Sequence, residues 1–358
     1  MRKLTRQITI GKIKIGGDAP ISVQSMCDTD TRDVATTIKQ IKRLHKVKCE
    51  IIRCAVPDMD AAEALAKIKQ LSPIPVIADI HFDYRLALKV LEGGIDGLRL
   101  NPGNIGGKLK VKEVVKAAAE RKVPIRIGVN GGSLEKELLA KYGHSTAEAM
   151  VESAMGHVRI LEDIGYNQIK ISMKASDVMK TVEAYRLLSA QVDYPLHIGI
   201  TEAGTKFNGT IKSSVGLGIL LADGIGDTLR VSLTGDTVDE VRVGYNILKS
   251  LNLRQYGINH VSCPTCGRCQ INLASVALQI EKRLHKIDCP ITVAVMGCGV
   301  NGPGEAREAD VGIAGGKGQA VLFRHGEQVR NVPENEMADA LVAEVMKIVK
   351  EKSKPGIL

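Results

Sequence analysis

The sequence contains no tryptophan, and aromatic residues make up only 3% of its 358 residues. Proteins that bind single-stranded nucleic acids usually stack bases on aromatic side chains interleaved with basic residues. The chain also lacks a long block of Lys and Arg, although its formal net charge is +9. This composition argues against a nucleic-acid partner. We expect the positive charge to converge instead on a small, highly anionic ligand.

Long apolar runs are also missing. No apolar stretch approaches the roughly 18 residues that a membrane span requires. The first residues, Met-Arg-Lys-Leu-Thr-Arg-Gln, lead directly into an alternating strand pattern and contain no apolar signal-peptide core. We therefore expect no membrane association and a cytoplasmic location. The eight cysteines are expected there to be reduced thiols or metal ligands rather than disulfides.

Short apolar runs alternate with helical patterns, such as Val34–Val47, through most of the chain. Eight such repeats predict an α/β fold, a (β/α)₈ TIM barrel. The alternative is an open doubly wound sheet. That fold usually has a glycine-rich phosphate turn after its first strand, and Ser25-Met26-Cys27-Asp28 stands there instead. A segment at Ile8–Ile15 precedes the repeats and is predicted to form a hairpin or lid. The apolar runs are Ile21–Ser25, Glu50–Cys54, Val76–Asp79, Gly97–Leu100, Ile125–Val129, Gln168–Ser172, Leu196–Ile200 and Thr228–Ser232.

The repeats end near residues 251–257, where we place a domain boundary. The TIM-barrel, substrate-binding domain is predicted to cover residues 1–255. Residues 256–358 show a pattern typical of a smaller α+β module that is large enough for its own core. Its predicted elements are a loop with a Cys-x-x-Cys motif, a helix at Asn272–His285, a strand at Ile291–Met296, a glycine-rich loop, strands at Asp310–Ala314 and Gln319–Arg324, and a helix at Glu334–Glu351.

Polar residues stand at the carboxyl ends of the predicted barrel strands, where the chemistry of a TIM barrel takes place. Nearly every strand brings a cation to this rim. A ring of Arg and Lys in a low-dielectric mouth is expected to bind a phosphorylated or diphosphorylated small molecule, with Arg making bidentate contacts. In strand order the residues are Gln24, Arg53, Asp79 with His81, Arg99 with Asn101, Arg126 with Asn130, Lys170 with Lys174, His197 with Thr201 and Glu202, and Arg230 with Ser232.

Each of these residues, taken alone, is also compatible with a structural role. Arg53 could pair with Asp79, and Arg230 could pair with Asp227, inside the rim. The acidic side chains of Asp79 and Glu202 are candidates for proton transfer, because a cationic mouth still needs a group that gives or takes a proton.

The C-terminal module contains Cys263-Pro-Thr-Cys266 and, farther on, Cys298 in a glycine-rich loop that ends at Glu305. A zinc ribbon would normally add a second Cys-x-x-Cys or a His pair, and a redox dithiol would not need Cys298. Three thiols and a carboxylate instead fit an iron–sulfur cluster with one weakly held iron. Cys269 offers a further thiol, so it could replace Glu305 as the fourth ligand. Small apolar fillers are the expected role of Cys27, Cys49, Cys54 and Cys289.

Motifs along essentially the whole chain resemble the 4-hydroxy-3-methylbut-2-enyl diphosphate synthases of bacteria and plastids. The most specific is the Asn-Gly-Pro-Gly-Glu loop that ends at Glu305. The short junction at Ser250–Val261 leaves no room for the extra domain of plant-type members, so the chain resembles the two-domain bacterial form. The other motifs are Ser-Cys-Pro-Thr-Cys at 262–266, Val-Gln-Ser-Met at 23–26, Ala-Asp-Ile-His at 78–81, Arg-Leu-Asn-Pro-Gly-Asn at 99–104, Ile-Gly-Val-Asn at 127–130, Ile-Ser-Met-Lys-Ala-Ser at 171–176, Gly-Ile-Thr-Glu-Ala-Gly at 199–204 and Val-Ser-Leu-Thr-Gly-Asp at 231–236.

The resemblance implies an oxidoreductase of the non-mevalonate isoprenoid pathway. It would open the ring of 2-C-methyl-D-erythritol 2,4-cyclodiphosphate reductively, with loss of water, to give the linear hydroxymethylbutenyl diphosphate. A [4Fe–4S] cluster is implied on Cys263, Cys266 and Cys298, with Glu305 as the labile fourth ligand and as a catalytic residue beside Glu202. The implied substrate-binding residues are Arg53, His81, Arg99, Arg126, Asn130, Lys174 and Ser232.

The resemblance also implies partners. Reduced flavodoxin or ferredoxin would supply single electrons. A head-to-tail homodimer would let each cluster domain close the barrel of its partner. Two alternatives remain from the residues themselves: a zinc-stabilised, nucleic-acid-binding protein, and a cluster-free barrel enzyme that acts on phosphorylated metabolites.

Overall fold

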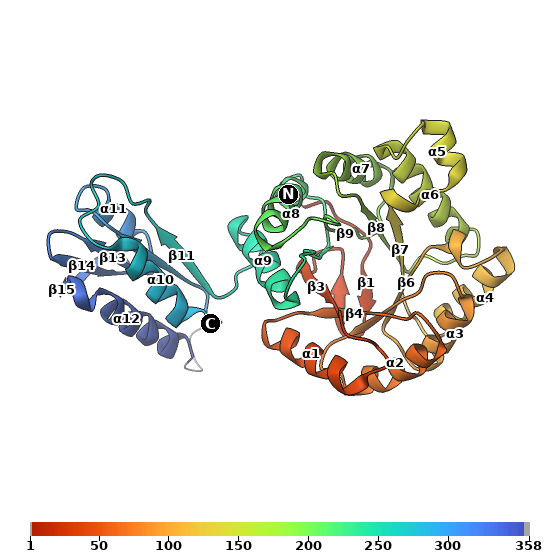
Figure 1. Ribbon diagram of the computed structural model, residues 1–358, viewed down its shortest axis with the longest axis horizontal. Helices are drawn as coiled ribbons and strands as arrows, with labels where there is room; N and C mark the ends of the chain where they lie inside the picture. Colours follow the sequence, from red (N-terminus) through yellow and green to blue (C-terminus); the bar gives the residue numbers. More distant parts are fainter. Residues whose placement is uncertain (1, 354–358) are drawn as a thin grey trace. The chain divides into compact units, whose positions relative to one another are not determined.

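The computed structural model describes residues 2–353, which form two compact units with the boundary between Arg254 and Gln255 (Figure 1). Each unit has its own sheet and its own buried core. Within the described residues, no helix is both long and apolar enough to cross a membrane.

The first unit is the predicted TIM barrel. Its eight parallel strands run in the order β8-β7-β6-β5-β4-β3-β10-β9. A parallel bridge between Ile171 and Leu196 joins β8 to the residues just before β9 and closes the circle. Each predicted apolar run overlaps a strand, which confirms the pattern of eight repeats. The strands are β3 (Ser22–Met26), β4 (Ile51–Ala55), β5 (Val76–Asp79), β6 (Gly97–Leu100), β7 (Ile125–Asn130), β8 (Ile169–Lys174), β9 (His197–Ile198) and β10 (Thr228–Leu229).

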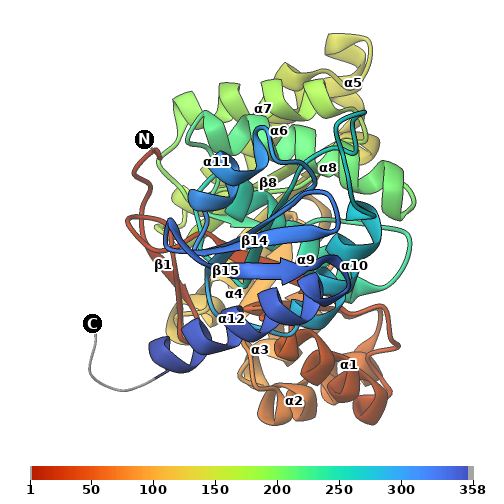
Figure 2. The ribbon, with the colours of Figure 1, turned by 90° about the vertical axis from the view of Figure 1, so that its left-hand side faces the viewer.

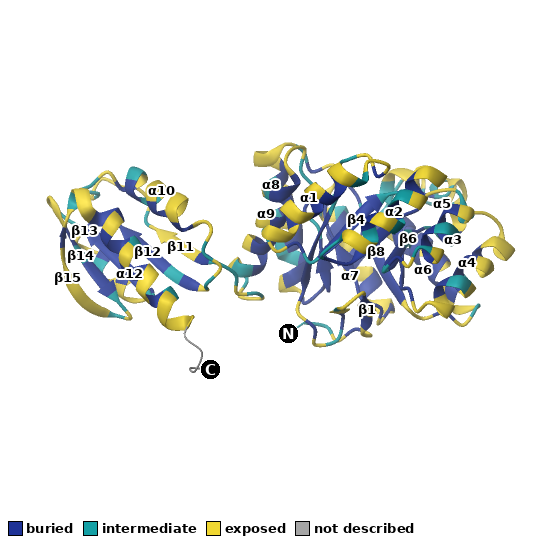
Figure 3. Ribbon diagram, turned by 90° about the horizontal axis from the view of Figure 1, so that it is seen from below, coloured by how far each residue is buried: buried dark blue, intermediate teal, exposed yellow. Residues whose placement is uncertain are grey.

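Helices surround the strands and turn their polar faces to solvent (Figure 3). Several begin at an aspartate whose carboxylate accepts a hydrogen bond from a backbone N–H of the first turn, as Asp33, Asp58 and Asp177 do. These caps end the strand-to-helix loops on the side where the strands have their carboxyl ends. The helices are α1 (Val34–Lys46), α2 (Met59–Leu71), α3 (Tyr84–Glu92), α4 (Lys108–Glu120), α5 (Lys136–Tyr142), α6 (Ala147–Glu162), α7 (Val178–Gln191), α8 (Lys206–Ala222) and α9 (Thr237–Ser250), with 3₁₀ turns η1 (Pro102–Asn104) and η2 (Gly131–Ser133).

The predicted hairpin closes the opposite end of the barrel. Strands β1 (Ile8–Ile10) and β2 (Ile13–Ile15) pair antiparallel across Gly11, whose φ of +56° suits a tight turn. Its buried isoleucines pack with Ile51 and Ile77, which lie near the amino ends of β4 and β5. The hairpin is therefore an apolar plug, and it lies at the end of the barrel opposite to the candidate site.

The second unit is an α+β module with one five-stranded sheet. Its strands run in the order β11-β12-β13-β14-β15; the first three are parallel and the last two antiparallel. Helices α10 and α12 pack together over one core, and α11 contributes Ala306 to a second, smaller core with Met296 and Phe323 (Figure 2). The elements are β11 (Ile258–Ser262), α10 (Leu273–Leu284), β12 (Ile291–Met296), α11 (Gly302–Arg307), β13 (Val311–Gly315), β14 (Gln319–Arg324), β15 (Glu327–Pro333), η3 (Glu334–Glu336) and α12 (Met337–Lys352).

Three elements of this module lie outside the predicted pattern. β11 and β15 are the edge strands of the sheet, and most of their residues are exposed. Without a buried face they carry little of the apolar alternation that marks a strand. The glycine-rich segment expected to be a loop contains the short helix α11, because Pro303 stands in the first turn, where a missing N–H costs nothing.

We predict that Gly312→Ala destabilises the second unit by about 1–3 kcal/mol. A Cβ at this position would lie 2.7 Å from the Cα of Ala306, and backbone atoms of α11 cannot move aside without shifting Glu305. Urea unfolding followed by circular dichroism measures the loss.

The matched control is Gly156→Ala in α6, where a Cβ meets nothing within 4 Å. This substitution should raise stability by about 0.5–1 kcal/mol, the ordinary gain of Ala over Gly in a helix. Equal stabilities of the two variants would contradict the close packing of α11 on β13.

Candidate active site

A cavity of about 200 Å³ opens at the carboxyl ends of the barrel strands. The structure brings together in its lining all seven residues predicted to bind substrate. The sequence analysis did not select several further lining residues as binding residues, among them Asp79 and Arg230. The lining residues are Arg53, Asp79, His81, Arg99, Arg126, Gly128, Val129, Asn130, Ser172, Lys174, Thr201, Arg230 and Ser232.

Positive charge dominates this cavity. Among the described residues that line it, five side chains are Arg or Lys and one, Asp79, is a carboxylate. Asp79 is buried and lies 3.5 Å from Arg53 Nε and 3.1 Å from Arg99 Nη1. One carboxylate cannot balance the positive charges around it, so the lining of the cavity is electropositive. An electropositive lining favours an anion with more than one negative charge.

Asp79 stays ionised and holds its two arginines in place. Burial would raise the pKa of Asp79, but the charges of Arg53 and Arg99 outweigh burial and hold that pKa below its ordinary value. Asp79 is therefore poorly suited to donate a proton at neutral pH, although its position had made it a candidate. Burial lowers the pKa of Arg53 to about 10, so this guanidinium remains charged at neutral pH.

The second pairing considered for the rim is not present. Arg53 pairs with Asp79, as the sequence suggested, but Arg230 does not pair with Asp227. Asp227 accepts hydrogen bonds from Thr5 Oγ1 at 2.9 Å and from the backbone N–H of Leu196 at 2.8 Å. The carboxylate near Arg230 is instead Glu240 of α9, at 3.5 Å.

Two arginines of the cavity also share an uncharged acceptor. Arg53 Nη2 lies 2.8 Å from Met26 Sδ, and Arg230 Nη1 lies 3.7 Å from the same sulfur. Met26 is the last residue of β3, which lies between β4, the strand that carries Arg53, and β10, the strand that Arg230 directly follows.

Strand alternation explains how these side chains meet. Arg126 on β7 is the register partner of Lys170 on β8, and Asn130 is the partner of Lys174. Residues two apart on a strand point to the same side, which here is the barrel interior. Gly128 completes the arrangement, because a Cβ there would lie 2.5 Å from Arg99 Nε. A glycine at this position gives the guanidinium of Arg99 the space to reach Asp79.

His81 and Lys174 complete the cavity in different ways. His81 Nε2 lies 2.8 Å from Arg99 Nη1. Burial and the charge of Arg99 lower the pKa of His81, so its neutral ring accepts a hydrogen bond from the guanidinium. Burial, with the repulsion of Arg230 and Arg126, lowers the pKa of Lys174 well below its ordinary value. An anion in the cavity would reverse that repulsion.

Glu202 does not line the cavity. It is exposed and directly follows Thr201, which does line it. Its φ is +52°, in the left-handed region that a residue with a side chain rarely adopts. Such strain is often found where a functional side chain must be aimed away from its strand.

The predicted cluster ligands lie on loops of the second unit. Cys263 follows β11, and its Sγ accepts a hydrogen bond from the backbone N–H of Gly297 at 3.3 Å. A backbone hydrogen bond from Arg268 lowers the pKa of Cys266, and the backbone N–H groups after Cys298 lower the pKa of Cys298. At Cys266 and Cys298 the donors favour thiolates, the form that binds iron, so the residues fit an iron–sulfur group chemically.

Glu305 lies on α11 and is exposed. Among residues 2–353, no three His, Cys, Asp or Glu side chains stand close enough together to hold one metal ion.

Cys269 has a different setting from the other three thiols. Its Sγ donates to the backbone oxygen of Ile271 at 3.3 Å, and its side chain packs partly into the core of the module. A Cβ on Gly297 would lie 2.5 Å from this sulfur. The thiol therefore rests against the backbone next to Cys298 and links the Cys-x-x-Cys loop to the end of β12.

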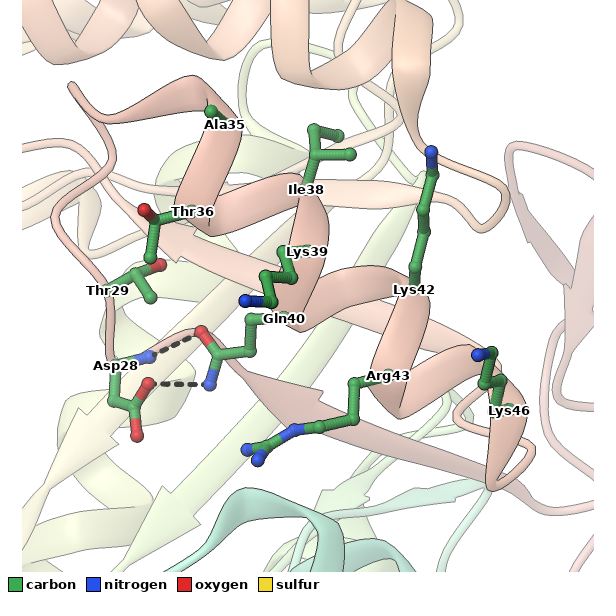
Figure 4. Close-up of a pocket in the computed structure, with 10 residues that line it drawn as sticks. All are labelled: Asp28, Thr29, Ala35, Thr36, Ile38, Lys39, Gln40, Lys42, Arg43 and Lys46. Carbon is green, nitrogen blue, oxygen red and sulfur yellow. Dashed lines mark hydrogen bonds between the residues drawn. The ribbon is translucent and has the colours of Figure 1, made fainter.

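A larger hollow, of about 720 Å³, lies along α1 (Figure 4). Its lysines, Lys39, Lys42 and Lys46, are exposed, and within it Gln40 bonds to Asp28 through both its amide atoms. None of the predicted site residues lines this hollow. The smaller cavity at the strand ends is therefore the candidate active site.

Comparison with known proteins shows the family of the chain. A family model described as the GcpE TIM-barrel domain matches residues 5–245, and one described as the GcpE protein C-terminal domain matches residues 259–347. The 4-hydroxy-3-methylbut-2-en-1-yl diphosphate synthase (flavodoxin) of Geobacter sulfurreducens is 76% identical over 352 residues, which cover 98% of this chain and 100% of that protein. The protein of the same name from Symbiobacterium thermophilum is 60% identical, over 95% of this chain and 92% of its own length. The chain therefore belongs to the GcpE family, the 4-hydroxy-3-methylbut-2-en-1-yl diphosphate synthases, which are iron–sulfur oxidoreductases of isoprenoid biosynthesis.

Proposed function

We propose that the cationic cavity binds the diphosphate of 2-C-methyl-D-erythritol 2,4-cyclodiphosphate while the ring is opened. The observation that supports this most strongly is the set of five Arg and Lys side chains in the lining against the single carboxylate of Asp79 among the described residues. Arg99 and Arg126 supply planar donor pairs suited to phosphate oxygens, and Lys174 adds a point charge. Asn130 and Ser232 supply neutral polar groups.

The reaction consumes two electrons and two protons. It breaks the carbon–oxygen bond to one phosphate and removes a neighbouring hydroxyl as water, which leaves the linear (E)-4-hydroxy-3-methylbut-2-enyl diphosphate. The residues that hold the substrate therefore hold the product as well, because both carry the diphosphate. Cations fixed before binding also stabilise the negative charge on the phosphate oxygen as its bond to carbon breaks.

We assign Cys263, Cys266 and Cys298 as thiolate ligands of a [4Fe–4S] cluster, with Glu305 as the labile fourth ligand. When bound, such a cluster supplies electrons one at a time. The support is the backbone N–H group of Gly297, which donates to Cys263 Sγ, and the backbone N–H groups that lower the pKa of Cys298, because such hydrogen bonds tune sulfur ligands. The setting of Cys269, engaged with Ile271 and Gly297, favours Glu305 over Cys269 as the fourth ligand.

Glu202 is proposed as the acid that protonates the departing oxygen. The support is that Glu202 directly follows Thr201, which lines the cavity, and that its φ of +52° lies in the left-handed region. Asp79 is held ionised by its arginines, which leaves Glu202 as the other carboxylate that the sequence predicts for proton transfer.

The remaining parts of the proposal concern partners. The relatives are named for flavodoxin, so we propose reduced flavodoxin, or ferredoxin, as the electron donor. We also propose a head-to-tail homodimer in which the cluster domain of one chain closes the barrel of the other. Phe82 and Phe207 support a covered mouth. Phe82 lies in the loop after β5 and Phe207 in the first turn of α8, and each is 76% exposed. The free thiols are consistent with a cytoplasmic location.

Anaerobically purified protein is predicted to be brown and to contain about four irons per chain. With a reduced one-electron donor it should convert the cyclodiphosphate to the linear diphosphate. Cys298→Ser should lose most of the iron, while Cys289→Ser and Cys269→Ser should retain it. Iron analysis and electron paramagnetic resonance of each variant provide the measurements.

A colourless protein, or one that contains zinc, would contradict the cluster. In that case salt-sensitive nucleic-acid binding, or turnover of other phosphorylated metabolites without iron, would become the functions to test. Loss of iron from Cys269→Ser would mean that this thiol, rather than Glu305, completes the ligand set.

Glu202→Gln is expected to lower kcat by about 100-fold or more, since general acids contribute on that order. KM should change little, because Glu202 does not line the cavity. The control is Glu183→Gln on the exposed face of α7, which should leave both constants unchanged. Unchanged kcat in the Glu202 variant would remove it as the proton donor.

Mixing Cys263→Ser chains with Arg99→Ala chains tests the dimer. Neither homodimer should be active, but half of the randomly mixed dimers would hold one intact barrel facing one intact cluster. Activity should return to about one quarter of the wild-type value. A mixture of Cys263→Ser and Cys298→Ser chains is the control and should stay inactive. No return of activity in the first mixture would show that each barrel uses its own cluster domain.

A further inference from the structure

Deeper in the barrel than the cavity, the interior holds a second group of polar side chains that the proposed reaction does not use. TIM barrels are usually filled by branched apolar residues at this depth. Here Gln24, Lys170 and His197 are buried, with at most 1% exposure. Several of their polar atoms, and those of two neighbours, have no hydrogen-bond partner within the described residues. These atoms are Ser22 Oγ, Gln24 Nε2 and Oε1, Arg126 Nε and Nη1, Lys170 Nζ and His197 Nε2.

The strand register places Lys170 directly below the anion site. Ser172 and Lys174 of the same strand line the cavity, and Lys170 precedes them with the same alternation. Its register partner on β7 is Arg126, which also lines the cavity. The amine is thus one pleat deeper than the residues that we expect to contact phosphate.

Four charged or titratable groups on other elements influence Lys170 or are influenced by it. Arg126 on β7 and Arg53 on β4 repel a charged amine, and Asp227, just before β10, attracts it. His197 on β9 forms a hydrogen bond between its Nδ1 and Thr228 Oγ1. Burial and the charge of Lys174 lower the pKa of His197 well below its ordinary value, so the neutral ring is favoured. Burial and Arg126 together lower the pKa of Lys170 well below its ordinary value. In the empty barrel burial and these neighbours therefore favour the neutral form of the amine, whose Nζ has no hydrogen-bond partner among the described residues.

We propose that Lys170 takes up a proton when a diphosphate occupies the cavity, and so supplies an additional buried positive charge below the anion site. The inference rests on the proposed anion-binding function and extends it to a residue that does not contact the ligand. An anion held by Arg126 adds negative charge just above the amine, and electrostatic attraction is strong in a low-dielectric interior. The proton comes from solvent. The unpartnered atoms of Ser22, Gln24 and His197 offer hydrogen bonds to waters along the way.

The sign of the pH dependence follows from linkage. The occupied protein carries one proton more than the empty protein, so affinity for the anion rises as pH falls between the two pKa values of Lys170. Within that window each taken-up proton makes affinity change by up to about tenfold per pH unit. Lys174 contributes a similar effect by direct contact, so the share of Lys170 must be measured as a difference between variants.

The test is isothermal titration calorimetry of inorganic pyrophosphate, carried out in two buffers of different ionisation enthalpy. Wild type, Lys170→Met, Lys170→Arg and the control Lys67→Met on the exposed face of α2 are compared at one pH. Titration of the ligand itself is the same for all four proteins and cancels in the differences. Lys170→Arg keeps a permanent cation and provides the measurement if the Met variant does not fold.

Wild type and Lys67→Met should take up more protons than either Lys170 variant, by up to about one proton per pyrophosphate bound. The Arg variant should retain affinity near that of wild type, and the Met variant should bind more weakly. Equal proton uptake in all four proteins would overturn the role of Lys170 while leaving the anion site intact. Failure of wild type to bind pyrophosphate at all would overturn the anion site itself, and this inference with it.

Discussion

Burial of like charges around one small cavity is the constraint on which the rest of the structure depends. A guanidinium or ammonium group that leaves water loses hydration, and neighbouring cations add repulsion to that loss. The barrel gathers five such groups at its mouth, among the residues described, with Asp79 as the lining carboxylate. Such an arrangement is tolerated only if the surrounding fold is stable enough to hold it, and it becomes favourable when a multiply charged anion enters.

The rest of the barrel provides that stability. The isoleucine plug of β1 and β2 fills the amino end, and aspartate caps begin several of the helices at the other end. Gly128 leaves room for Arg99, and Asp79 fixes Arg99 and Arg53 by ion pairs. Each of these features restricts where a cation can point. The site therefore has little freedom to collapse on itself, and the charges remain directed at the cavity.

Much of this arrangement could be predicted from the sequence, because strand alternation and position at a strand end are local properties. They placed Arg53, Arg99 and Arg126 at one rim, where the structure has them. The partners of these residues depend on contacts between distant segments. The packing of α9 against β3 determines that Arg230 lies near Glu240 and not near Asp227. No local sequence pattern predicts this packing.

Local patterns in the sequence also do not show how deep a side chain lies in the barrel or which strands lie at the edge of a sheet. The pattern Ile-Lys-Ile-Ser-Met-Lys puts Lys170 and Lys174 on one side of β8, but only the closed barrel shows that the first is sealed below the second. Edge strands such as β15 have few buried residues, and a helix that opens with Gly-Pro-Gly looks like a loop. The strands of the barrel and the inner strands of the second sheet were therefore predictable, whereas the edge strands of the second sheet were less so.

The thioether of Met26 gives the charged mouth an unusual property. A carboxylate between Arg53 and Arg230 would orient both side chains but would also cancel part of their field. Sulfur in a thioether is a weak acceptor without formal charge, so it restrains the two guanidiniums without adding to the negative charge of Asp79 and Glu240, which already lie 3.5 Å from them. Conversion of this sulfur to a sulfoxide would place a strong, fixed dipole in the same position, and oxidation of a single uncharged atom would then change how the two guanidiniums are held.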